Sequence, residues 1–498
     1  MTHDWTASSW KNIKFTRVEL IIVLLTFLLL SSIGIAYHEI WLDEAQHFLL
    51  ARDSDSFAEW ARNCHNEGHP LLWDVILFLI TRFSNHVLTM QIVHLIISLM
   101  SVTVICRIPF GKIEKLLIIF GYYIFYEYNL VCRNYSISVL FLLLLIEQYR
   151  LNRNGILRLA ILVFFLSNTH LFSLLISMAF VLFFLIMDRK LLRAKNSFSL
   201  LLSSAIVLGG WLLSLYSILP DANYGAHFYA IDPTSLCSLD RFFRAASLAL
   251  KGIFFTPDYF NTSHHFENSS LLYGLNVEVG LKIFLNALAW IIPIFILWKH
   301  PRALIFFLLT NLFLLPAFYF LPLVQGTRYF GFEYLIFISS CFLFETPPSR
   351  IVRNIAILIF SIQFINGIFM YCADIKHPFS EGKDVWRCLL KYPNSSEPVI
   401  ILEPNLRPAI SAYACMKLFG IENGIPSSFR KWELNVNPSI QKEFCNLKLK
   451  GLHSCLVIVH DSLQASCFEG WQALLLKSFR EGMVEGENAD IFLLTRKK

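Results

Sequence analysis

Stretches of about twenty consecutive apolar residues recur along this chain of 498 residues, and they constrain its fold more than any other feature. A helix rises about 1.5 Å per residue, so about 20 apolar residues cross the hydrocarbon core of a bilayer. Composition agrees, because 56% of the residues are hydrophobic and only 16% are charged, against about 25% charged in soluble domains. The pattern predicts a polytopic membrane protein that is mainly α-helical, and it excludes a disordered chain.

The apolar runs predict a transmembrane helical bundle of about eleven spans. Residues 71–81 are apolar but too short to cross, so we expect an interfacial helix there. Residues 155–187 are too long for one span, and we divide them at Asn168-Thr169-His170. The first run has no small-residue cleavage site, so we expect a retained anchor. The expected spans are residues 18–37, 86–106, 115–130, 136–149, 156–169, 171–187, 198–218, 280–298, 303–320, 329–344 and 354–373.

Basic residues in the loops predict the orientation, because cytoplasmic loops are enriched in Lys and Arg. The short loops on the side of the N-terminus carry 17 basic residues, whereas the longer loops on the other side carry eight. We therefore expect a cytoplasmic N-terminus, with the loops 38–85 and 219–279 and the C-terminal segment outside the cytoplasm. The net charge of +6 belongs to this loop bias and indicates no nucleic-acid partner.

The density of charge changes near Asp374. Residues 374–498 hold 30 of the 78 charged side chains, about 24% of that segment, whereas residues 1–373 hold 48, about 13%. This change predicts a transmembrane domain at 1–373 and a small extracytoplasmic α/β domain at 374–498. The expected strands of that domain are residues 399–402 and 456–459, and its expected helices are residues 409–418 and 471–479.

Cysteines and sequons in the predicted outer regions depend on the compartment. An oxidising compartment favours disulfides, but no C-x-x-C pair or metal-like spacing occurs among these cysteines, so paired and free thiols both stay open. The sequons matter only in a eukaryotic lumen. The cysteines are Cys372, Cys388, Cys415, Cys445, Cys455 and Cys467, and the sequons are at Asn261, Asn268 and Asn394.

Polar residues from distant parts of the chain gather on the predicted outer face. Ionisable groups at membrane depth are costly and usually face a cavity or a partner. The shared side is therefore a stronger signal of function than any one residue. These residues are Asp43, Glu44, His69, Glu127, Arg133, Tyr135, His170, Arg328 and Tyr329.

The charged members of this set also have plainer structural interpretations. Asp43 and Glu44 suit the first turn of a helix, where the helix dipole favours negative charge. Arg133 and Arg328 suit anchors that extend along apolar surface toward the headgroups. Both interpretations stay open from the sequence.

The histidines likewise have simpler interpretations. His69 precedes Pro70, which suits a turn. His65 and His69 are four residues apart, which suits a metal site only on a helix and with a third ligand. The pair His264-His265 lies in a Ser/Asn-rich loop, where we expect solvation.

In this order, the polar residues resemble the motifs of the GT-C superfamily of integral membrane glycosyltransferases. The likeness is to the bacterial branch related to protein O-mannosyltransferases and to the transferases that add aminoarabinose or galacturonic acid to lipid A, and it covers most of residues 18–373. Relatives often have two prolines after the histidine, where this chain has only Pro70. The matching motifs are Trp41-Leu42-Asp43-Glu44-Ala45, Gly68-His69-Pro70-Leu71, Arg133-Asn134-Tyr135, His170 and Arg328-Tyr329.

This resemblance implies an inverting transfer of a sugar from a polyprenyl-phosphate-linked donor to a hydroxyl of a cell-envelope glycolipid, polysaccharide or protein. The membrane implied is the bacterial inner membrane. Asp43 would be the catalytic base, with Glu44 as its helper or as the group that orients the acceptor. Arg133, Arg328, His170 and His69 would bind the donor phosphate, and Tyr135, Tyr329 and Glu127 would position the substrate.

Whether a divalent cation takes part stays open at this point. Some relatives need one and others do not. Asp43, Glu44 and Glu127 offer the oxygen ligands that Mg²⁺ or Mn²⁺ prefers.

Two other functional classes remain as alternatives. A transporter or flippase of lipid-linked saccharides predicts polar residues through the membrane midplane and an internal repeat, and the chain shows no repeat. An O-antigen polymerase or ligase predicts its chemistry in a late outer loop. The loop 219–279 carries Arg241 and Arg244 there but no comparable set of acids and histidines.

Overall fold

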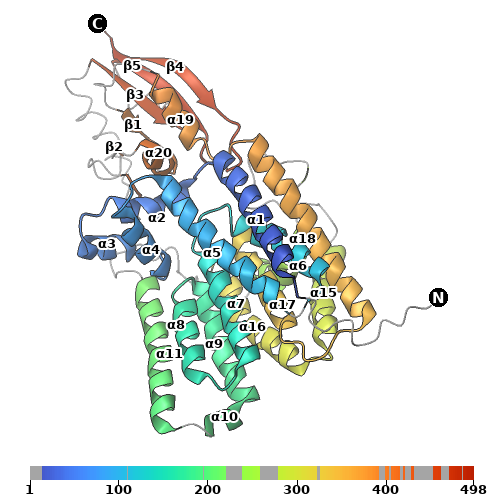
Figure 1. Ribbon diagram of the computed structural model, residues 1–498. Helices are drawn as coiled ribbons and strands as arrows, with labels where there is room; N and C mark the ends of the chain where they lie inside the picture. Colours follow the sequence, from blue (N-terminus) through green and yellow to red (C-terminus); the bar gives the residue numbers. More distant parts are fainter. Residues whose placement is uncertain are drawn as a thin grey trace.

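A computed structural model of the chain is mainly helical, with one small sheet near the C-terminus. The helices pack side by side as an elongated bundle, and the sheet lies at one end of that bundle (Figure 1). The structure describes residues 14–108, 110–193, 196–219, 238–257, 259, 279–321, 326–391, 399–402, 405–414, 419–420, 428–430, 453–460, 470–484 and 486–497.

Six helices in the described part of the chain are long and apolar enough to cross a membrane. They support the prediction of a membrane protein, while the count of eleven spans stays a prediction. The six helices are α1 (Arg17–Tyr37), α5 (Val87–Arg107), α11 (Ser197–Ile218), α15 (Val279–Leu297), α16 (Pro301–Phe320) and α18 (Arg350–Lys376).

The other five predicted spans coincide with shorter elements. The predicted division at residues 168–170 is confirmed, because one helix ends at Ser167 and the next begins at Leu171. The elements are α6 (Lys112–Ile119) followed by the π-helix η2 (Tyr122–Glu127), α7 (Tyr135–Leu151), α8 (Ile156–Ser167), α9 (Leu171–Met187) and α17 (Thr327–Cys341).

The predicted continuous span 115–130 is interrupted after Ile119, where α6 ends. Gly121 has an extended backbone, and η2 begins directly after it. Helix α18 approaches closely here, because a Cβ atom at Gly367 would lie 2.9 Å from the carbonyl oxygen of Phe120. The break therefore lies where α18 packs against residues 120–122.

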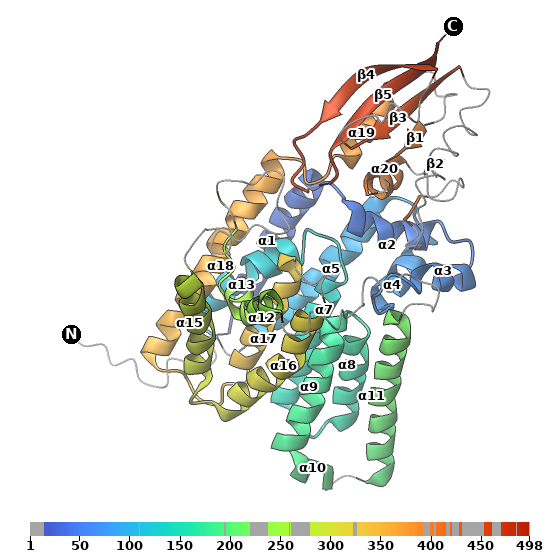
Figure 2. The same ribbon diagram turned by 180° about the vertical axis from the view of Figure 1, so that it is seen from behind.

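The predicted outer loop 38–85 is itself largely helical. A helix, α4 (Leu72–Thr81), is present at the residues 71–81 where we expected one, and its place at the membrane interface stays a prediction. It lies beside α2 and α3, at the end of the bundle that faces the sheet (Figure 2). The remaining short helices are α2 (Leu42–Arg52), α3 (Phe57–Cys64), α10 (Arg189–Arg193), α12 (Leu239–Ala246) and α13 (Leu248–Gly252).

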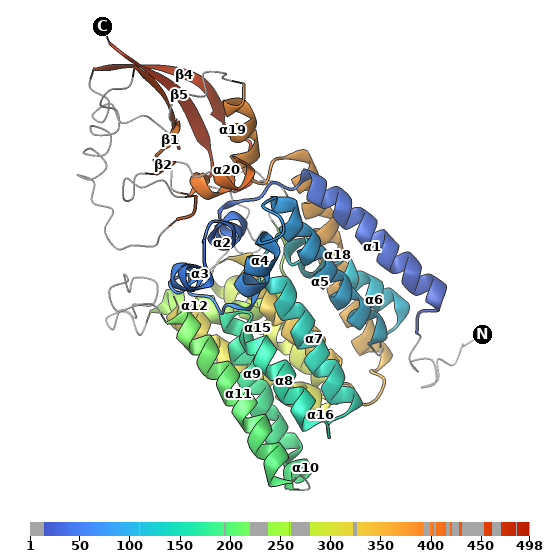
Figure 3. The same ribbon diagram turned by 60° about the vertical axis from the view of Figure 1, so that its left-hand side comes forward.

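The C-terminal segment forms a five-stranded mixed sheet in the order β2-β1-β3-β5-β4. Strand β1 is parallel to β2 and β3, whereas β5 is antiparallel to β3 and β4. Helices α19 and α20 lie against this sheet, and α20 faces α2 (Figure 3). The elements are α19 (Gly382–Leu389), β1 (Val399–Ile401), α20 (Leu406–Ala414), β2 (Phe419–Gly420), β3 (Ser454–Val459), β4 (Trp471–Phe479) and β5 (Ala489–Arg496).

The helix predicted at residues 471–479 is wrong, because this segment is strand β4. Its leucine-rich sequence suits a helix in isolation. Pairing with β5 along nearly its whole length overrides that local preference, and it leaves Leu474 and Leu475 exposed on the strand. Both strands predicted at 399–402 and 456–459 are present, as β1 and β3.

Several sequence features lie outside the described residues. These are the sequons at Asn261, Asn268 and Asn394, the pair His264-His265, most of the loop 219–279, and Cys415, Cys445 and Cys467. Of the other cysteines of the outer set, Cys372 is an exposed free thiol and Cys388 is a buried one.

Candidate functional site

Asp43 lies between two guanidinium groups at the start of α2. Its carboxylate accepts a hydrogen bond from Nη1 of Arg133, and Nη2 of Arg328 lies 3.1 Å from the same oxygen. Arg133 comes from the turn before α7, and Arg328 comes from the first turn of α17. Three segments far apart in sequence therefore meet at one carboxylate, as the sequence predicted from their common side of the membrane.

Electrostatics keep Asp43 ionised. Burial alone would raise the pKa of its carboxyl, but Arg133 and Arg328 outweigh that effect and lower the pKa below its ordinary value. The Asp43 side chain is still 22% exposed, whereas that of Arg133 is 3% exposed. The carboxylate is thus the accessible member of the pair, and Arg133 is buried inside the protein rather than extended over its surface.

We call Asp43, Arg133, Arg328 and the rings around them the cluster. Glu44, the residue after Asp43, joins two chain segments beside it. One carboxylate oxygen accepts the backbone N–H of Cys132 at 2.6 Å, and the other accepts that of Trp41 at 3.3 Å. The contact with Cys132 ties the turn that carries Arg133 to α2. Glu44 is fully buried, so its geometry assigns it to positioning rather than to contact with an acceptor.

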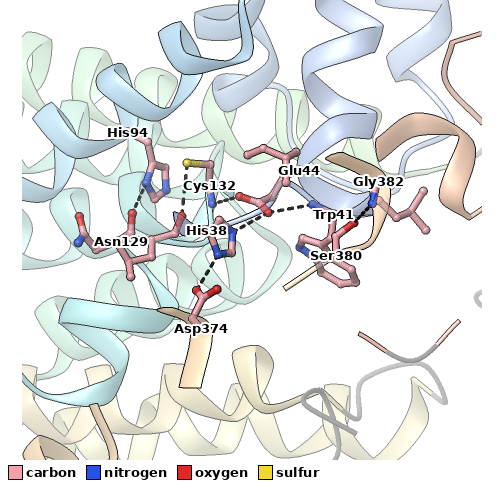
Figure 4. Close-up of polar contacts among 12 residues, drawn as sticks. His38, Trp41, Glu44, His94, Asn129, Cys132, Asp374, Ser380 and Gly382 are labelled. Carbon is pink, nitrogen blue, oxygen red and sulfur yellow. Dashed lines mark hydrogen bonds and ion pairs between the residues drawn. The ribbon is translucent and has the colours of Figure 1, made fainter. Parts of the chain in front are cut away.

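His38 binds Glu44 and so helps to hold it in place. Its Nε2 lies 3.1 Å from Glu44, and its Nδ1 lies 2.7 Å from Asp374 at the end of α18 (Figure 4). Burial lowers the pKa of His38, but the two carboxylates reverse the effect and raise the pKa to about 10. His38 is therefore an imidazolium that bridges α1, α2 and α18.

The turn before α7 has a second support. The two ring nitrogens of His94, on α5, lie 3.0 Å from the carbonyl oxygens of Asn129 and Arg133. Figure 4 shows the contact between His94 and Asn129, with Cys132 and His38 beside it. With Glu44 bound to Cys132, these contacts fix the direction in which Arg133 leaves the backbone.

Arg328 is placed by the close packing of α17 on η2. Tyr128 donates a hydrogen bond of 2.6 Å to the carbonyl oxygen of Arg328. Gly331 lies one turn further along α17, where a Cβ atom would come within 2.3 Å of Tyr123 and of the Tyr128 hydroxyl. Only glycine lets the helix approach this closely, so Gly331 helps to set the position of Arg328.

Imidazole and phenol rings line the same cluster. The rings of His69 and His170 stack at 5.6 Å, and Tyr135 lies 5.1 Å from His170 and 6.4 Å from Tyr329. The guanidinium of Arg133 lies 5.6 Å from the Tyr135 ring. All these residues were predicted from sequence, and the structure brings them together.

Three buried polar atoms in this cluster have no hydrogen-bond partner among the described residues: His69 Nδ1, Arg133 Nε and the Tyr135 hydroxyl. His69 Nε2 lies 3.4 Å from a guanidinium nitrogen of Arg133 and accepts from it, so Nδ1 carries a proton. Each of these three atoms can donate a hydrogen bond, so they suit a ligand with acceptor atoms.

The cluster also carries one positive charge in excess, because one carboxylate faces two guanidinium groups. His69 adds no charge, since burial and the neighbouring Arg133 lower its pKa well below the ordinary value. A monoanion would therefore balance the site.

Glu127 has a hydrogen-bond partner other than the arginines that contact Asp43. It lies on η2 and accepts a hydrogen bond of 2.6 Å from the hydroxyl of Tyr122. The three carboxylates that the sequence offered as oxygen ligands thus have separate partners: arginines for Asp43, His38 and two backbone N–H groups for Glu44, and Tyr122 for Glu127. Within the described ranges, no group of three or more acidic, His or Cys side chains is placed to hold a metal.

Sequence reasoning missed four residues around the site. His38 and Asp374 were not predicted, because no sequence pattern indicates that the end of the first span contacts the end of the last one. His47 and Asp74 form a second buried pair, with 2.6 Å between His47 Nδ1 and Asp74 Oδ1. His47 was detectable, since it lies four residues after Asp43 and therefore on the same face of α2.

Comparison with known proteins adds no relative. No protein-family model matches the chain, and no curated protein matches it. The resemblance to GT-C enzymes therefore depends on the motif residues of the sequence alone.

Proposed function

We propose that this protein is an inverting glycosyltransferase that moves a sugar from a polyprenyl-phosphate-linked donor to a hydroxyl group. The observation that carries the proposal is the single carboxylate of Asp43 held against Arg133 and Arg328. This reaction needs a base that accepts the proton of the hydroxyl and cations that bind the phosphate. The carboxylate of Asp43 and the two guanidinium groups supply both. The acceptor is a cell-envelope glycolipid, polysaccharide or protein.

The arginines would bind the donor phosphate. A planar guanidinium makes two parallel charge-assisted hydrogen bonds to a phosphate, and it stays charged at every physiological pH. A sugar phosphodiester carries one negative charge, which matches the one excess positive charge of the cluster. Hydrogen bonds from Arg133, Arg328 and His69 would then stabilise the charge that grows on the departing phosphate oxygen.

Asp43 would take the proton from the acceptor hydroxyl. While it is paired with both arginines it is a weak base, because they lower its pKa. A bound phosphate competes for the same guanidinium groups and so loosens their hold on Asp43. Binding of the donor would therefore raise the basicity of Asp43 at the moment when a base is needed.

An apolar groove supports a lipid-linked donor. Helix α9 begins directly after His170. Its C-terminal half lines a groove of about 270 Å³ together with α8 and α11. Phe180, on this groove, is ten residues beyond His170, or about 15 Å along a helix. A polyprenyl chain whose phosphate lies in the cluster would extend along α9 to this groove. The lining includes Leu159, Val163, Phe184, Leu200, Ser204 and Trp211.

The proposed cellular location is the bacterial inner membrane, with the cluster and the C-terminal domain on the extracytoplasmic side. Support comes from the bias of basic residues toward the other loops. It also comes from the sheet, which lies at the same end of the bundle as α2 (Figure 2). An acceptor would approach from this end.

The experiment is a transfer assay with the purified protein in nanodiscs. A panel of polyprenyl-phosphate sugars is supplied with extracted envelope glycolipids, and products are identified by mass spectrometry. Envelopes from cells with and without the gene identify the sugar and the acceptor together. Product formation supports the proposal. Intact donor throughout the panel, with lipid-linked saccharide moved across the bilayer instead, would establish the transporter alternative.

Arg328→Ala tests the phosphate assignment. Loss of a charge-assisted hydrogen bond worth about 1.5–3 kcal/mol weakens donor binding by about tenfold or more. Arg62→Ala, on the exposed face of α3, is the matched control and should bind donor like the wild type. Equal donor affinity in both variants would contradict the assignment.

A further inference from the structure

His47 and Asp74 form a buried pair directly beside the cluster. The imidazole of His47 is 6% exposed and the carboxylate of Asp74 is 2% exposed, with 2.6 Å between Nδ1 and Oδ1. His47 belongs to α2 and Asp74 to α4, two helices that pack on each other. A carboxylate on one ring nitrogen fixes the orientation of an imidazole and leaves its other nitrogen to exchange a proton.

His47 is oriented toward the proposed reacting groups by its place on α2. Asp43 and His47 are four residues apart on this helix, so their side chains share a face. The His47 ring also lies 5.5 Å from the ring of His69, which contacts Arg133. The His47–Asp74 pair therefore lies next to the cluster, in contact with it through His69.

Asp43 needs a group to which it can pass a proton. Its carboxylate faces two guanidinium groups, which disfavour the protonated acid. A proton received from an acceptor hydroxyl would leave Asp43 quickly if a better base lay within reach. The imidazole of His47, stabilised as a cation by Asp74, is such a base.

We propose that the His47–Asp74 pair is the proton acceptor of the transfer site and receives the proton of the acceptor hydroxyl by way of Asp43. This inference rests on the proposed function. His47 acts through Asp43, so it is a positioning and proton-holding residue rather than one that touches the sugar.

The step balances as follows. The acceptor O–H bond breaks while its oxygen forms a bond to the anomeric carbon of the donor. The bond from that carbon to the phosphate oxygen breaks, and its electron pair leaves with the phosphate. The proton passes to Asp43 and then to Nε2 of His47, while Asp74 holds the Nδ1 proton. The imidazolium later releases its proton to water.

Charged and titratable groups from four segments surround His47. They are Asp74 on α4, Asp43 on α2, Glu67 and His69 in the segment before α4, and Arg133 before α7. Burial lowers the pKa of His47, but Asp74 dominates and raises it above the ordinary value. An elevated pKa suits a group that holds a proton near neutral pH.

The test uses the full-length protein in nanodiscs and two variants. His47→Asn keeps an N–H that can bond to Asp74 but removes the basic nitrogen. We expect transfer from the active polyprenyl-phosphate sugar to slow by about 100-fold, with donor affinity unchanged and with the alkaline rise of the rate-against-pH profile lost. Asp74→Asn should retain that rise but move it toward lower pH.

His65→Asn is the matched control, because it makes the same substitution at another histidine of the same loop, whose ring packs on Tyr216. It should transfer like the wild type. A normal rate in His47→Asn would overturn the proposal. So would an equal loss of donor binding and rate with an unchanged pH profile, because that result indicates a structural role.

A second measurement separates this proposal from the proposed function. Exchange of the imidazole C2 hydrogen with deuterium, followed by mass spectrometry, reports the pKa of each histidine without any substrate. The pKa of His47 should fall in Asp74→Asn and stay unchanged in His65→Asn. A wild-type protein that transfers no sugar contradicts the proposed function. An unchanged His47 pKa in Asp74→Asn contradicts the proposal that Asp74 stabilises the protonated His47.

Discussion

At the scale of single residues, the site depends on which partner each charge has. Asp43 and Glu44 are adjacent in sequence, yet Asp43 faces two arginines whereas Glu44 is bonded to His38 and two backbone N–H groups. The helix-capping interpretation of this pair therefore holds for Glu44, which accepts the N–H of Trp41. Asp43 is the carboxylate that the proposed reaction uses as its base.

Asp43→Asn separates catalysis from binding. The amide keeps the size of the side chain but accepts no proton, so we expect sugar transfer to fall by about 100-fold or more. It also frees both guanidinium groups, so the affinity for the donor should stay equal or rise. Transfer rates and donor binding are measured on the same preparation. A parallel fall in donor affinity and thermal stability would indicate that Asp43 is only a structural partner of the arginines.

His38 predicts a pH dependence of stability. Its folded pKa of about 10 lies above the ordinary value of about 6.5. Its stabilising effect is therefore complete below about pH 6.5 and is lost as pH rises toward 10. Thermal melting in detergent should show Tm falling over this range.

His38→Gln checks this prediction, because glutamine can donate a hydrogen bond but does not titrate. The variant should melt at a lower temperature at pH 6.5 and lose less stability toward pH 10. His377→Gln, at the end of α18, is the matched control and should follow the wild type. Equal slopes for His38→Gln and the wild type would show that another group controls the alkaline loss.

At the scale of elements, breaks in the helices determine where the site residues lie. The interruption between α8 and α9 places His170 at a helix N-terminus, where its Nδ1 accepts the backbone N–H of Phe172. The interruption between α6 and η2 lets the chain turn before Arg133. The break before α9 thus coincides with a residue of the cluster, whereas the break before η2 lies further from it in the chain.

The groove between α8, α9 and α11 yields a prediction at this scale. Ser204→Trp places a large ring in the groove from an exposed position on α11, so it should not disturb the core. We expect a higher KM for donors with a long polyprenyl chain and an unchanged KM for donors with a short one. The assay compares two chain lengths of the same sugar donor.

Leu212→Trp is the control for this variant. Leu212 is on the same helix and 66% exposed, and it is not part of the groove lining. Its KM should match that of the wild type for both donors. An equal effect of both tryptophans on the two chain lengths would mean that the lipid chain of the donor lies elsewhere.

At the scale of the whole molecule, the C-terminal segment holds the start of α2 in place. The N–H of Ile40 donates to the Tyr413 hydroxyl at 2.8 Å, and the N–H of Leu42 donates to Glu487 at 2.7 Å. These two contacts flank Trp41 and immediately precede Asp43. The C-terminal segment therefore contributes two of the hydrogen bonds that hold the start of α2.

Tyr413→Phe tests this support. The buried N–H of Ile40 would lose its acceptor, which costs about 1–3 kcal/mol. Amide hydrogen exchange in residues 40–46 should become faster, and transfer should slow without a change in the fold of the sheet. Tyr216→Phe, at an exposed position of α11, is the control. Unchanged exchange at residues 40–46 would show that the domain does not stabilise the site.

The sequence by itself determined the membrane class, the helical character and most of the cluster. Apolar length and residue type carry that information locally, and the motif order carried Asp43, Arg133, His69, His170 and Arg328. Only the tertiary structure separated the roles of Asp43 and Glu44, revealed His38 with Asp374 and His47 with Asp74, and turned residues 471–479 into a strand. The physical reason is that a charge takes its role from its partners, and a strand forms by pairing. Both depend on contacts between residues far apart in the chain, which a local pattern does not encode.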